Sequence, residues 1–227
     1  NLGKSILTSK EVMQLIAERF IPTMTIAFTS IFISFSMGAT LGVISGHNKS
    51  LKIDHAIRII SLSALAFPIF SLAPLLVIIF SIKFNLLPVS EWGTLRHCVL
   101  PILTLSIPLT SVIIRVSRNK YLEESQAPFV TVLRSKGLDE VQIIKRIFKN
   151  CLPTILNIVA IQLSVVLAGT MVTESIFDIP GIGSLLFNGI EGRDYPVVQG
   201  VIIYSTIVYM LIYFLVDFIN NKIDQRI

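Results

Sequence analysis

The sequence predicts an all-α, polytopic membrane protein with five transmembrane helices. Of its 227 residues, 53% are hydrophobic and only 15% are charged, whereas a soluble domain carries about 25% charged residues. The apolar residues also gather in five runs close to the roughly 20 residues that one membrane helix requires. These runs are Pro22–Gly46, Ile59–Ile82, Cys98–Ile114, Leu152–Thr173 and Val197–Ile219.

The connections between the runs differ in charge, and this difference orients the spans. Residues 47–58 contain three Lys or Arg against one acidic residue, and residues 115–151 contain eight against four. Of the other two connections, residues 83–97 contain Lys83 and Arg96 as their only Lys or Arg residues, and residues 174–196 contain only Arg193. Because short basic loops remain in the cytoplasm, we expect 115–151 and the tail 221–227 to be cytoplasmic. The membrane domain then covers 20–220, and the amphipathic segment 1–19 lies outside.

The distribution of charge also excludes one class of partner. The net charge of +5 sits in short loops between apolar runs. Nucleic-acid binding would instead place basic and aromatic residues together on one exposed surface. The charge pattern therefore indicates a lipid bilayer as the partner and no nucleic acid.

Residues 115–151 are too long for a turn and carry an amphipathic pattern. Pro128 suits a first helical position, and Gly137 suits a helix C-terminus. A second amphipathic stretch follows over 141–149, so we expect two short helices hinged at Gly137 along the membrane face. They could rest on anionic lipid or dock another protein. The residues between Pro128 and Gly137 are apolar at Phe129, Val130, Val132 and Leu133, and basic at Arg134 and Lys136.

Four charged residues near the expected outer ends of the last two spans are candidates for an external gate or a substrate path. They are Glu174, Asp178, Arg193 and Asp194. A carboxylate at membrane depth is a functional candidate by default, and Glu174 could face a cationic peptide terminus or a metal chelate. The alternatives are that Glu174 is solvated or pairs with Arg193.

The sequence offers no catalytic, cofactor or metal site. It has no Gly-x-x-x-x-Gly-Lys-[Ser/Thr] loop for ATP phosphates, and no Ser/His/Asp or Cys/His constellation is apparent. His47, His55 and His97 are dispersed along the chain. We therefore expect a protein that is not an enzyme. The Gly-x-x-x-Gly pair of Gly38 and Gly42 permits close helix contact, and packing within the chain is favoured over a dimer seam.

Residues 129–138, Phe-Val-Thr-Val-Leu-Arg-Ser-Lys-Gly-Leu, resemble the cytoplasmic signature loop of binding-protein-dependent ABC transporter permeases of the dipeptide/oligopeptide/nickel branch. That pattern runs roughly Tyr-Val-Arg-Thr-Ala-Arg-Ala-Lys-Gly-Leu, and Val132 and Leu133 are bulkier than its usual residues. Three further stretches are similar to the family in the same order. They are residues 1–5, residues 87–90 followed by 100–105, and Glu174-Ser-Ile-Phe-Asp-Ile-Pro-Gly-Ile-Gly183 with Arg193-Asp-Tyr-Pro-Val-Val-Gln-Gly200.

This resemblance implies the type I ABC importer permease fold in a bacterial inner membrane, with six helices in the full-length subunit and the first one missing here. It implies a second homologous permease, two ATP-binding subunits and an extracytoplasmic solute-binding protein as partners. Peptides and nickel are both compatible cargoes. The residues it implies for coupling to the ATPase are Phe129, Val132, Leu133, Arg134, Lys136 and Gly137.

Two other functions predict different sequence features. A stand-alone secondary transporter or channel predicts inverted repeats and charged residues at mid-span, and neither is evident in the sequence. A purely structural membrane anchor would not need the patterned segment 115–151.

Overall fold

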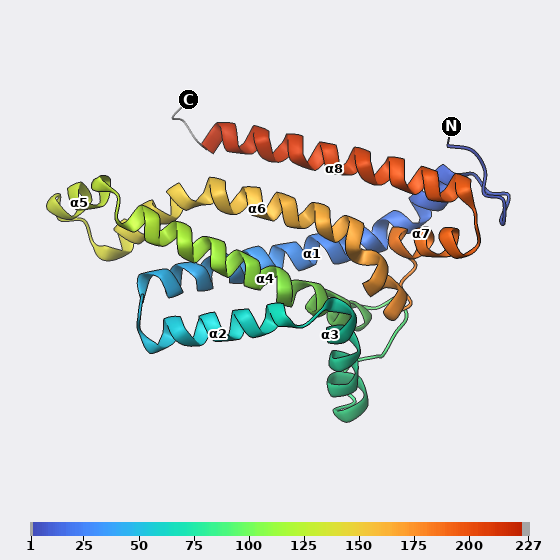
Figure 1. Cartoon of the computed structure of the whole chain (residues 1–227), viewed down its shortest axis with the longest axis horizontal. Helices are drawn as coiled ribbons and strands as arrows, with labels where there is room; N and C mark the ends of the chain where they lie inside the picture. Colours follow the sequence, from blue (N-terminus) through green and yellow to red (C-terminus); the bar gives the residue numbers. More distant parts are fainter. Residues whose placement is uncertain (1, 224–227) are drawn as a thin grey trace. The chain divides into compact units, whose positions relative to one another are not determined.

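The computed structural model describes residues 2–223, except for the side chains of residues 165, 167–169 and 220–223. Residues 224–227 of the expected tail therefore lie outside the described part. Helices form nearly all of the described chain (Figure 1), which confirms the all-α prediction. They are α1 (Val12–His47), α2 (Lys52–Ala66), α3 (Ile69–Leu76), the π-helical segment η1 (Val77–Lys83), α4 (Leu95–Ser125), α5 (Pro128–Ser135), α6 (Glu140–Ile176), α7 (Ile182–Glu191) and α8 (Tyr195–Ile223).

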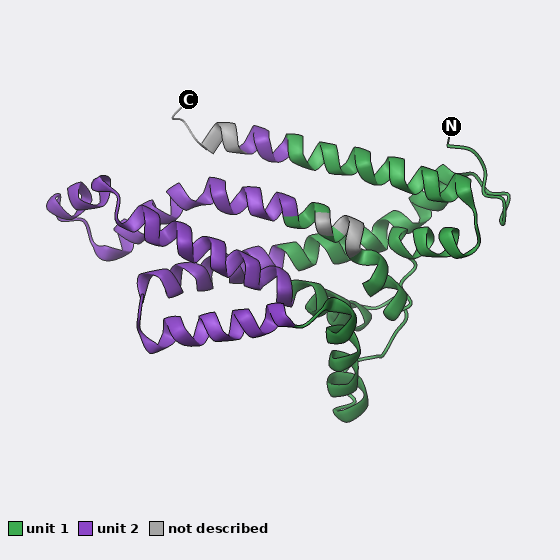
Figure 2. Cartoon of the chain, viewed as in Figure 1, with its two compact units in different colours: residues 1–31, 67–106, 162–214 green, residues 32–66, 107–161, 215–227 purple. Residues whose placement is uncertain are grey.

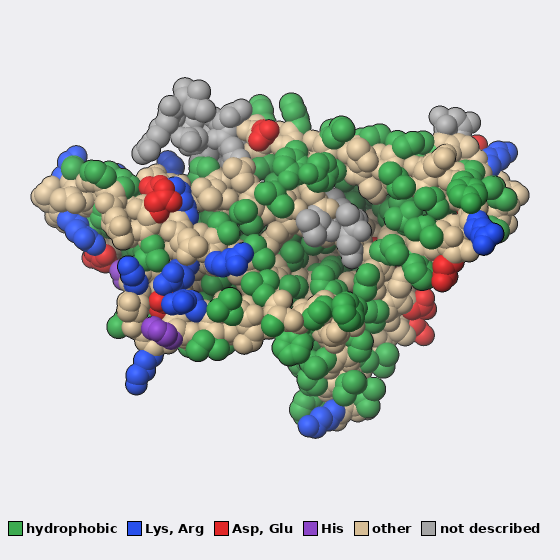
Figure 3. Space-filling model, viewed as in Figure 1, with side chains coloured by type: hydrophobic (Ala, Val, Ile, Leu, Met, Phe, Trp, Pro, Cys, Tyr) green, Lys and Arg blue, Asp and Glu red, His purple; other side chains and the backbone are tan. Residues whose placement is uncertain are grey.

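Four of these helices are long and apolar enough to cross a membrane: Val12–His47, Leu95–Ser125, Glu140–Ser164 and Tyr195–Ile219. A fifth span results if α2 and the α3–η1 segment are counted together. The described chain thus contains the predicted five apolar regions. Exposed apolar side chains cover much of the visible surface (Figure 3), as a lipid-facing surface requires.

The second region differs from the expectation of one continuous helix over residues 59–82. The helix breaks at Phe67 and Pro68, where Pro68 has extended backbone angles of φ −62° and ψ 146°. Because a proline ring disfavours helical geometry in the preceding residue, α2 ends at Ala66 and a new helix begins at Ile69. Pro74 lies inside α3, and the π-helical turns of η1 follow it.

The amphipathic stretch after Gly137 also differs from the prediction. Residues 141–149 were expected to form a short separate helix, but α6 runs without interruption from Glu140 to Ile176, and it contains Pro153. Proline is tolerated in membrane helices where other groups satisfy the freed carbonyl. The consequence is that residues 140–149 belong to the same helix as an apolar span.

The chain divides into two compact units (Figure 2), and α1, α4, α6 and α8 each contribute residues to both. Unit 1 comprises residues 1–31, 67–106 and 162–214. One of its buried clusters joins the start of α1 to α7 and α8. The members of this cluster are Val12, Leu15, Ile16, Ile182, Leu185, Val197 and Val201.

Unit 2 comprises residues 32–66, 107–161 and 215–227. Its α1 and α4 segments approach closely because one face of α1 carries glycine at every fourth position. A Cβ atom added to Gly38 would lie 2.6 Å from Ile113 Cβ, and one added to Gly42 would lie 2.5 Å from Ser117 Cβ. Gly46 faces Tyr121 in the same way. The predicted packing of the Gly-x-x-x-Gly pair within the chain is therefore confirmed.

Candidate functional site

The short helix α5 lies between two membrane-length helices and is anchored by its own apolar residues. Pro128 occupies its first turn, after Ala127 in an extended conformation. Val130 and Leu133 are buried in one cluster with Tyr121 of α4 and Ile143 and Ile147 of α6. Since residues three apart share a helix face, these two side chains hold α5 on its neighbours.

The C-terminus of α5 is closed by a Schellman motif. The Leu138 amide donates to the Leu133 carbonyl at 3.3 Å, and the Gly137 amide donates to the Arg134 carbonyl at 2.9 Å. Gly137 has a φ of +73°, and no atom lies within 4 Å of where a Cβ would be. Glycine is thus required here by backbone geometry and not by packing.

The other face of α5 is exposed. Val132 is 50% exposed, although it is apolar. Arg134 and Lys136 are also exposed, and Arg134 makes an ion pair of 3.6 Å with Glu140. The predicted coupling residues are therefore divided: Leu133 faces the protein, Phe129 is half-buried, and Val132, Arg134 and Lys136 face outward.

A hollow of about 320 Å³ adjoins α5 in unit 2. Phe129 and Leu133 form its apolar side, and Arg146, Lys149 and Asn150 of α6 form its polar side. The positions on α6 were not among the predicted coupling residues. The signal that could have found them is the four-residue spacing of Arg146 and Asn150, which places both on one face once α6 is known to be continuous.

In unit 1, Glu174 is completely buried and joins the end of α6 to α1 and α7. Its carboxylate accepts hydrogen bonds from the Thr23 hydroxyl at 2.7 Å and from the Ser184 amide at 2.8 Å. The Thr23 hydroxyl in turn accepts from the Ile182 amide at 2.8 Å. A carboxylate that accepts amide hydrogens of a first turn stabilises the helix N-terminus, so Glu174 caps α7.

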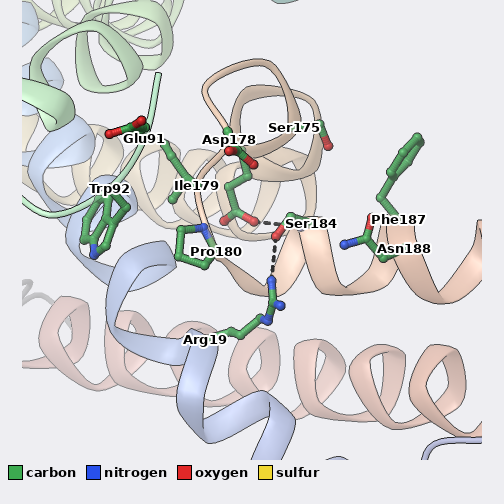
Figure 4. A pocket seen from close by; sticks show the side chains of 11 residues that line it. Arg19, Glu91, Trp92, Ser175, Asp178, Ile179, Pro180, Ser184, Phe187 and Asn188 are labelled. Atoms are coloured by element: carbon green, nitrogen blue, oxygen red, sulfur yellow. Dashed lines mark hydrogen bonds between the residues drawn. The ribbon is translucent and has the colours of Figure 1, made fainter. Parts of the chain in front are cut away.

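A cavity of about 600 Å³ lies next to this junction, also within unit 1 (Figure 4). Arg19 points into it and donates to the Ser184 hydroxyl at 3.2 Å. Glu91, Trp92 and Asp178 add further charged and aromatic groups to the lining. The cavity thus brings carboxylates, one guanidinium and an indole ring together in a partly open space.

The predicted gate residues fall into two groups. Glu174 and Asp178 line the cavity, and Asp178 is exposed. Arg193 is exposed and Asp194 is buried, and neither is among the lining residues. Arg19, Glu91 and Trp92 were not predicted as site residues, because they come from parts of the chain that only the fold brings together.

Asp194 caps α8 and fastens the N-terminal segment. Its carboxylate accepts hydrogen bonds from the Ser5 hydroxyl and from the amides of Ile6 and Leu7, the latter two at 3.1 and 3.3 Å. Burial alone would raise the pKa of Asp194, but these bonds and one from the Val197 amide outweigh it and lower the pKa below its usual value. The carboxylate is therefore held ionised as a structural link.

Comparison with known proteins identifies the class. Residues 38–227 match the profile described as binding-protein-dependent transport system inner membrane component. The chain is 30% identical to a probable peptide ABC transporter permease protein of Sinorhizobium fredii, with 100% of this chain and 75% of that protein covered. It is 32% identical to the glutathione transport system permease protein GsiC of Pectobacterium atrosepticum, with 100% and 74% covered.

The fold has solved counterparts. An inward-facing structure of the MetNI methionine ABC transporter superposes with a TM-score of 0.76 at 18% identity, covering 94% of this chain and 98% of that one. The crystal structure of an amino acid ABC transporter superposes with a TM-score of 0.68 at 14% identity, covering 92% of this chain and 94% of that one. The fold and the similarity to these permeases identify the chain as an ABC transporter permease with the predicted type I fold. The chain belongs to the binding-protein-dependent transport system inner membrane component family, a family of multi-pass membrane proteins.

Proposed function

We propose that this chain is the transmembrane permease subunit of an ATP-driven importer and forms half of a pathway completed by a second permease of the same fold. We place ATP hydrolysis in two separate ATP-binding subunits and cargo delivery in an extracytoplasmic solute-binding protein. The description of the family, which names a binding-protein-dependent system, supports the last assignment. The lack of a phosphate-binding loop in these 227 residues supports separate ATP-binding subunits.

The proposed orientation follows from the basic connections. α5, the turn after α1 and the C-terminal end of α8 face the cytoplasm of a bacterial inner membrane. The cavity lined by Arg19, Glu91 and Asp178 faces the outside. Each permease would then present α5 to an ATP-binding subunit and the cavity side to the binding protein.

The strongest support for the proposal is that α5 is fixed on one face and exposes an apolar residue on the other. Val130 and Leu133 fix the helix from within, so the exposed Val132 is held in one position. An apolar residue on a rigid helix, flanked by Arg134 and Lys136, suits a groove with a polar rim on another protein. A lone interfacial helix would instead need its most apolar face toward lipid, and that face is the one used internally.

The continuity of α6 gives the docking helix a mechanical role. Because α5 shares a buried cluster with Ile143 and Ile147, a displacement of α5 is delivered to the start of a 37-residue helix. No flexible linker intervenes between that cluster and the apolar span. Closure of the ATP-binding subunits would therefore move α5 and α6 together, as alternating access requires.

We further propose a dipeptide or oligopeptide as cargo. A zwitterionic peptide carries an ammonium group that Asp178 and Glu91 could bind and a carboxylate that Arg19 could bind, since a guanidinium has donors beyond the one used on Ser184. The relatives named for peptide and glutathione transport support this class. A nickel chelate is the other cargo that the branch resemblance implies.

Reconstitution of the whole importer tests the proposal. The permease pair, the ATP-binding subunits and the binding protein are placed in proteoliposomes, and uptake of a labelled dipeptide is measured with and without ATP. We expect uptake that requires both ATP and the binding protein and that excess nickel does not suppress. Uptake driven by an ion gradient without ATP would identify a secondary transporter, and ATP-dependent uptake of nickel alone would contradict the cargo.

A further inference from the structure

A second cavity, of about 290 Å³, lies between α2 and α4 in unit 2. Three arginines line it, Arg58 from α2 and Arg115 and Arg118 from α4, together with the apolar side chains of Leu62, Leu65 and Ile114. Figure 3 shows Lys and Arg side chains gathered on the surface of unit 2 around these two helices. The cavity therefore combines a strongly basic end with an apolar wall.

One of the arginines is fixed and neutralised. Arg118 makes two hydrogen bonds, of 2.8 and 2.9 Å, to the carboxylate of Asp54, which is only 1% exposed. The Ser45 hydroxyl and the Ser50 amide also donate to Asp54. A bidentate pair of this kind sets the geometry of both partners, so one wall of the cavity is rigid before any ligand arrives.

The other two arginines keep their charges. Arg58 and Arg115 are exposed, and within residues 2–223 neither guanidinium takes part in an ion pair or hydrogen bond that the structure describes. A guanidinium presents a planar set of donors that matches phosphate and is less strongly hydrated than an ammonium. Two such groups beside the cavity between α2 and α4 favour an anionic, phosphate-bearing ligand.

The positions of Arg58 and Arg115 place the basic end at the membrane boundary. Arg58 directly precedes the apolar run that begins at Ile59, and Arg115 directly follows the run that ends at Ile114. Beyond Arg58, the side chains of Ile59, Ile60 and Leu62 are exposed, as they would be against acyl chains. A ligand at this site thus meets charge at headgroup depth and apolar surface at hydrocarbon depth.

We infer that this cavity binds an anionic phospholipid, with its phosphate at Arg58 and Arg115 and an acyl chain along Leu62 and Leu65. Basic pockets between membrane helices are suited to anionic headgroups. The lipid would bridge α2 and α4 and so stabilise unit 2. This inference depends on the chain being a membrane protein and not on its cargo or its ATP-binding partners.

Lipid binding by the intact purified importer tests the inference. The complex is exchanged into a neutral detergent and titrated with phosphatidylglycerol, phosphatidylcholine or soluble glycerol 3-phosphate. Bound lipid is counted by native mass spectrometry and the thermal midpoint is recorded. We expect saturable retention of phosphatidylglycerol and a rise in midpoint, and neither effect with phosphatidylcholine or glycerol 3-phosphate.

The variant Arg58→Gln with Arg115→Gln should weaken phosphatidylglycerol binding by about tenfold to thirtyfold, since each basic residue contributes about 1 kcal/mol to anionic-lipid attraction. Its midpoint without added lipid should equal that of wild type. The control Lys49→Gln with Lys52→Gln removes the same amount of charge, from the connection that contains Arg58. Neither lysine lines the cavity, so this control should bind phosphatidylglycerol as wild type does.

Three results would overturn the assignment. Equal lipid binding by wild type and the arginine variant would mean that the cavity is not the site. Equal stabilisation by glycerol 3-phosphate would identify a soluble phosphate as the ligand. Loss of the second permease from the arginine variant, with lipid binding intact, would make the cavity a subunit interface.

Discussion

The Glu174 carboxylate is used within the protein at the junction of α1, α6 and α7. It accepts from the Thr23 hydroxyl and from the Ser184 amide, and Gly181 packs against it so closely that a Cβ there would collide with it. Asp178, only four residues later, is exposed and lines the same cavity. The two carboxylates therefore have different tasks, one structural and one open to a ligand.

We predict that Glu174→Gln and Asp178→Asn separate these tasks. Glu174→Gln places an amide group against hydrogen-bond donors and should lower the free energy of unfolding by about 1–3 kcal/mol. Asp178→Asn should leave the thermal midpoint unchanged and reduce peptide uptake. Thermal unfolding in detergent and uptake in proteoliposomes measure the two effects. Unchanged stability of Glu174→Gln would contradict the capping role.

Asp194 gives the protein an acid-sensitive component of stability. Because the folded pKa is lowered, the unfolded state binds the proton first. The stabilisation is therefore complete above the ordinary aspartate pKa of about 3.9. It is lost as the pH falls through the lower pKa that Asp194 has in the folded protein. We predict that Asp194→Asn has a lower thermal midpoint than wild type at pH 7. The difference should shrink as the pH approaches 3, and a pH-independent difference would contradict this account.

At the level of elements, α5 depends on one glycine for its stop. Gly137 has a positive φ with open space around it, so a side chain there meets backbone strain and no clash. We predict that Gly137→Ala destabilises the Schellman turn by about 1–2 kcal/mol and that Gly137→Asn costs less, since asparagine tolerates this conformation better. Association with the ATP-binding subunits should decline more in Gly137→Ala than in Gly137→Asn. Equal effects of both variants would point to a packing role instead.

The elements that the sequence predicted correctly are those with a strong local signal. The apolar runs and Pro128 before an amphipathic stretch define α5 and most of the spans. The separate helix over 141–149 was wrong because an amphipathic stretch and an apolar span can share one helix, and no glycine or proline stands between Asp139 and Cys151. The apolar run over residues 59–82 did not itself indicate the break at Pro68, because proline is often tolerated in membrane helices.

The site residues found only in the structure depend on long-range contacts. Thr23 and Glu174 are 151 positions apart, and Ser5 and Asp194 are 189 apart. Charge type alone made Glu174 and Asp194 candidates, but only their donors show that both are caps. Arg19 belongs to α1, whereas the adjacent Glu91 and Trp92 belong to the loop before α4, and no periodicity links these two segments. The burial of the Leu133 side chain likewise follows from its packing against α6.

For the whole molecule, the central claim is that α5 connects this permease to a separate ATPase. Leu133 is buried, so a charge there would damage the unit itself and could not isolate docking. Val132 is a sharper probe because it is 50% exposed. Val89, in the connection expected on the opposite side of the membrane, is 49% exposed and provides a matched control.

The most direct measurement is co-purification of the ATP-binding subunits with tagged permease carrying Val132→Asp or Val89→Asp, with the thermal midpoint of each permease recorded alongside. We predict that Val132→Asp reduces the bound ATP-binding subunits at least about tenfold, as burying an unpaired charge costs more than 1.4 kcal/mol, while its midpoint stays that of wild type. Val89→Asp should retain them in full. Wild-type amounts of ATP-binding subunits on the Val132→Asp permease would contradict the docking role of α5.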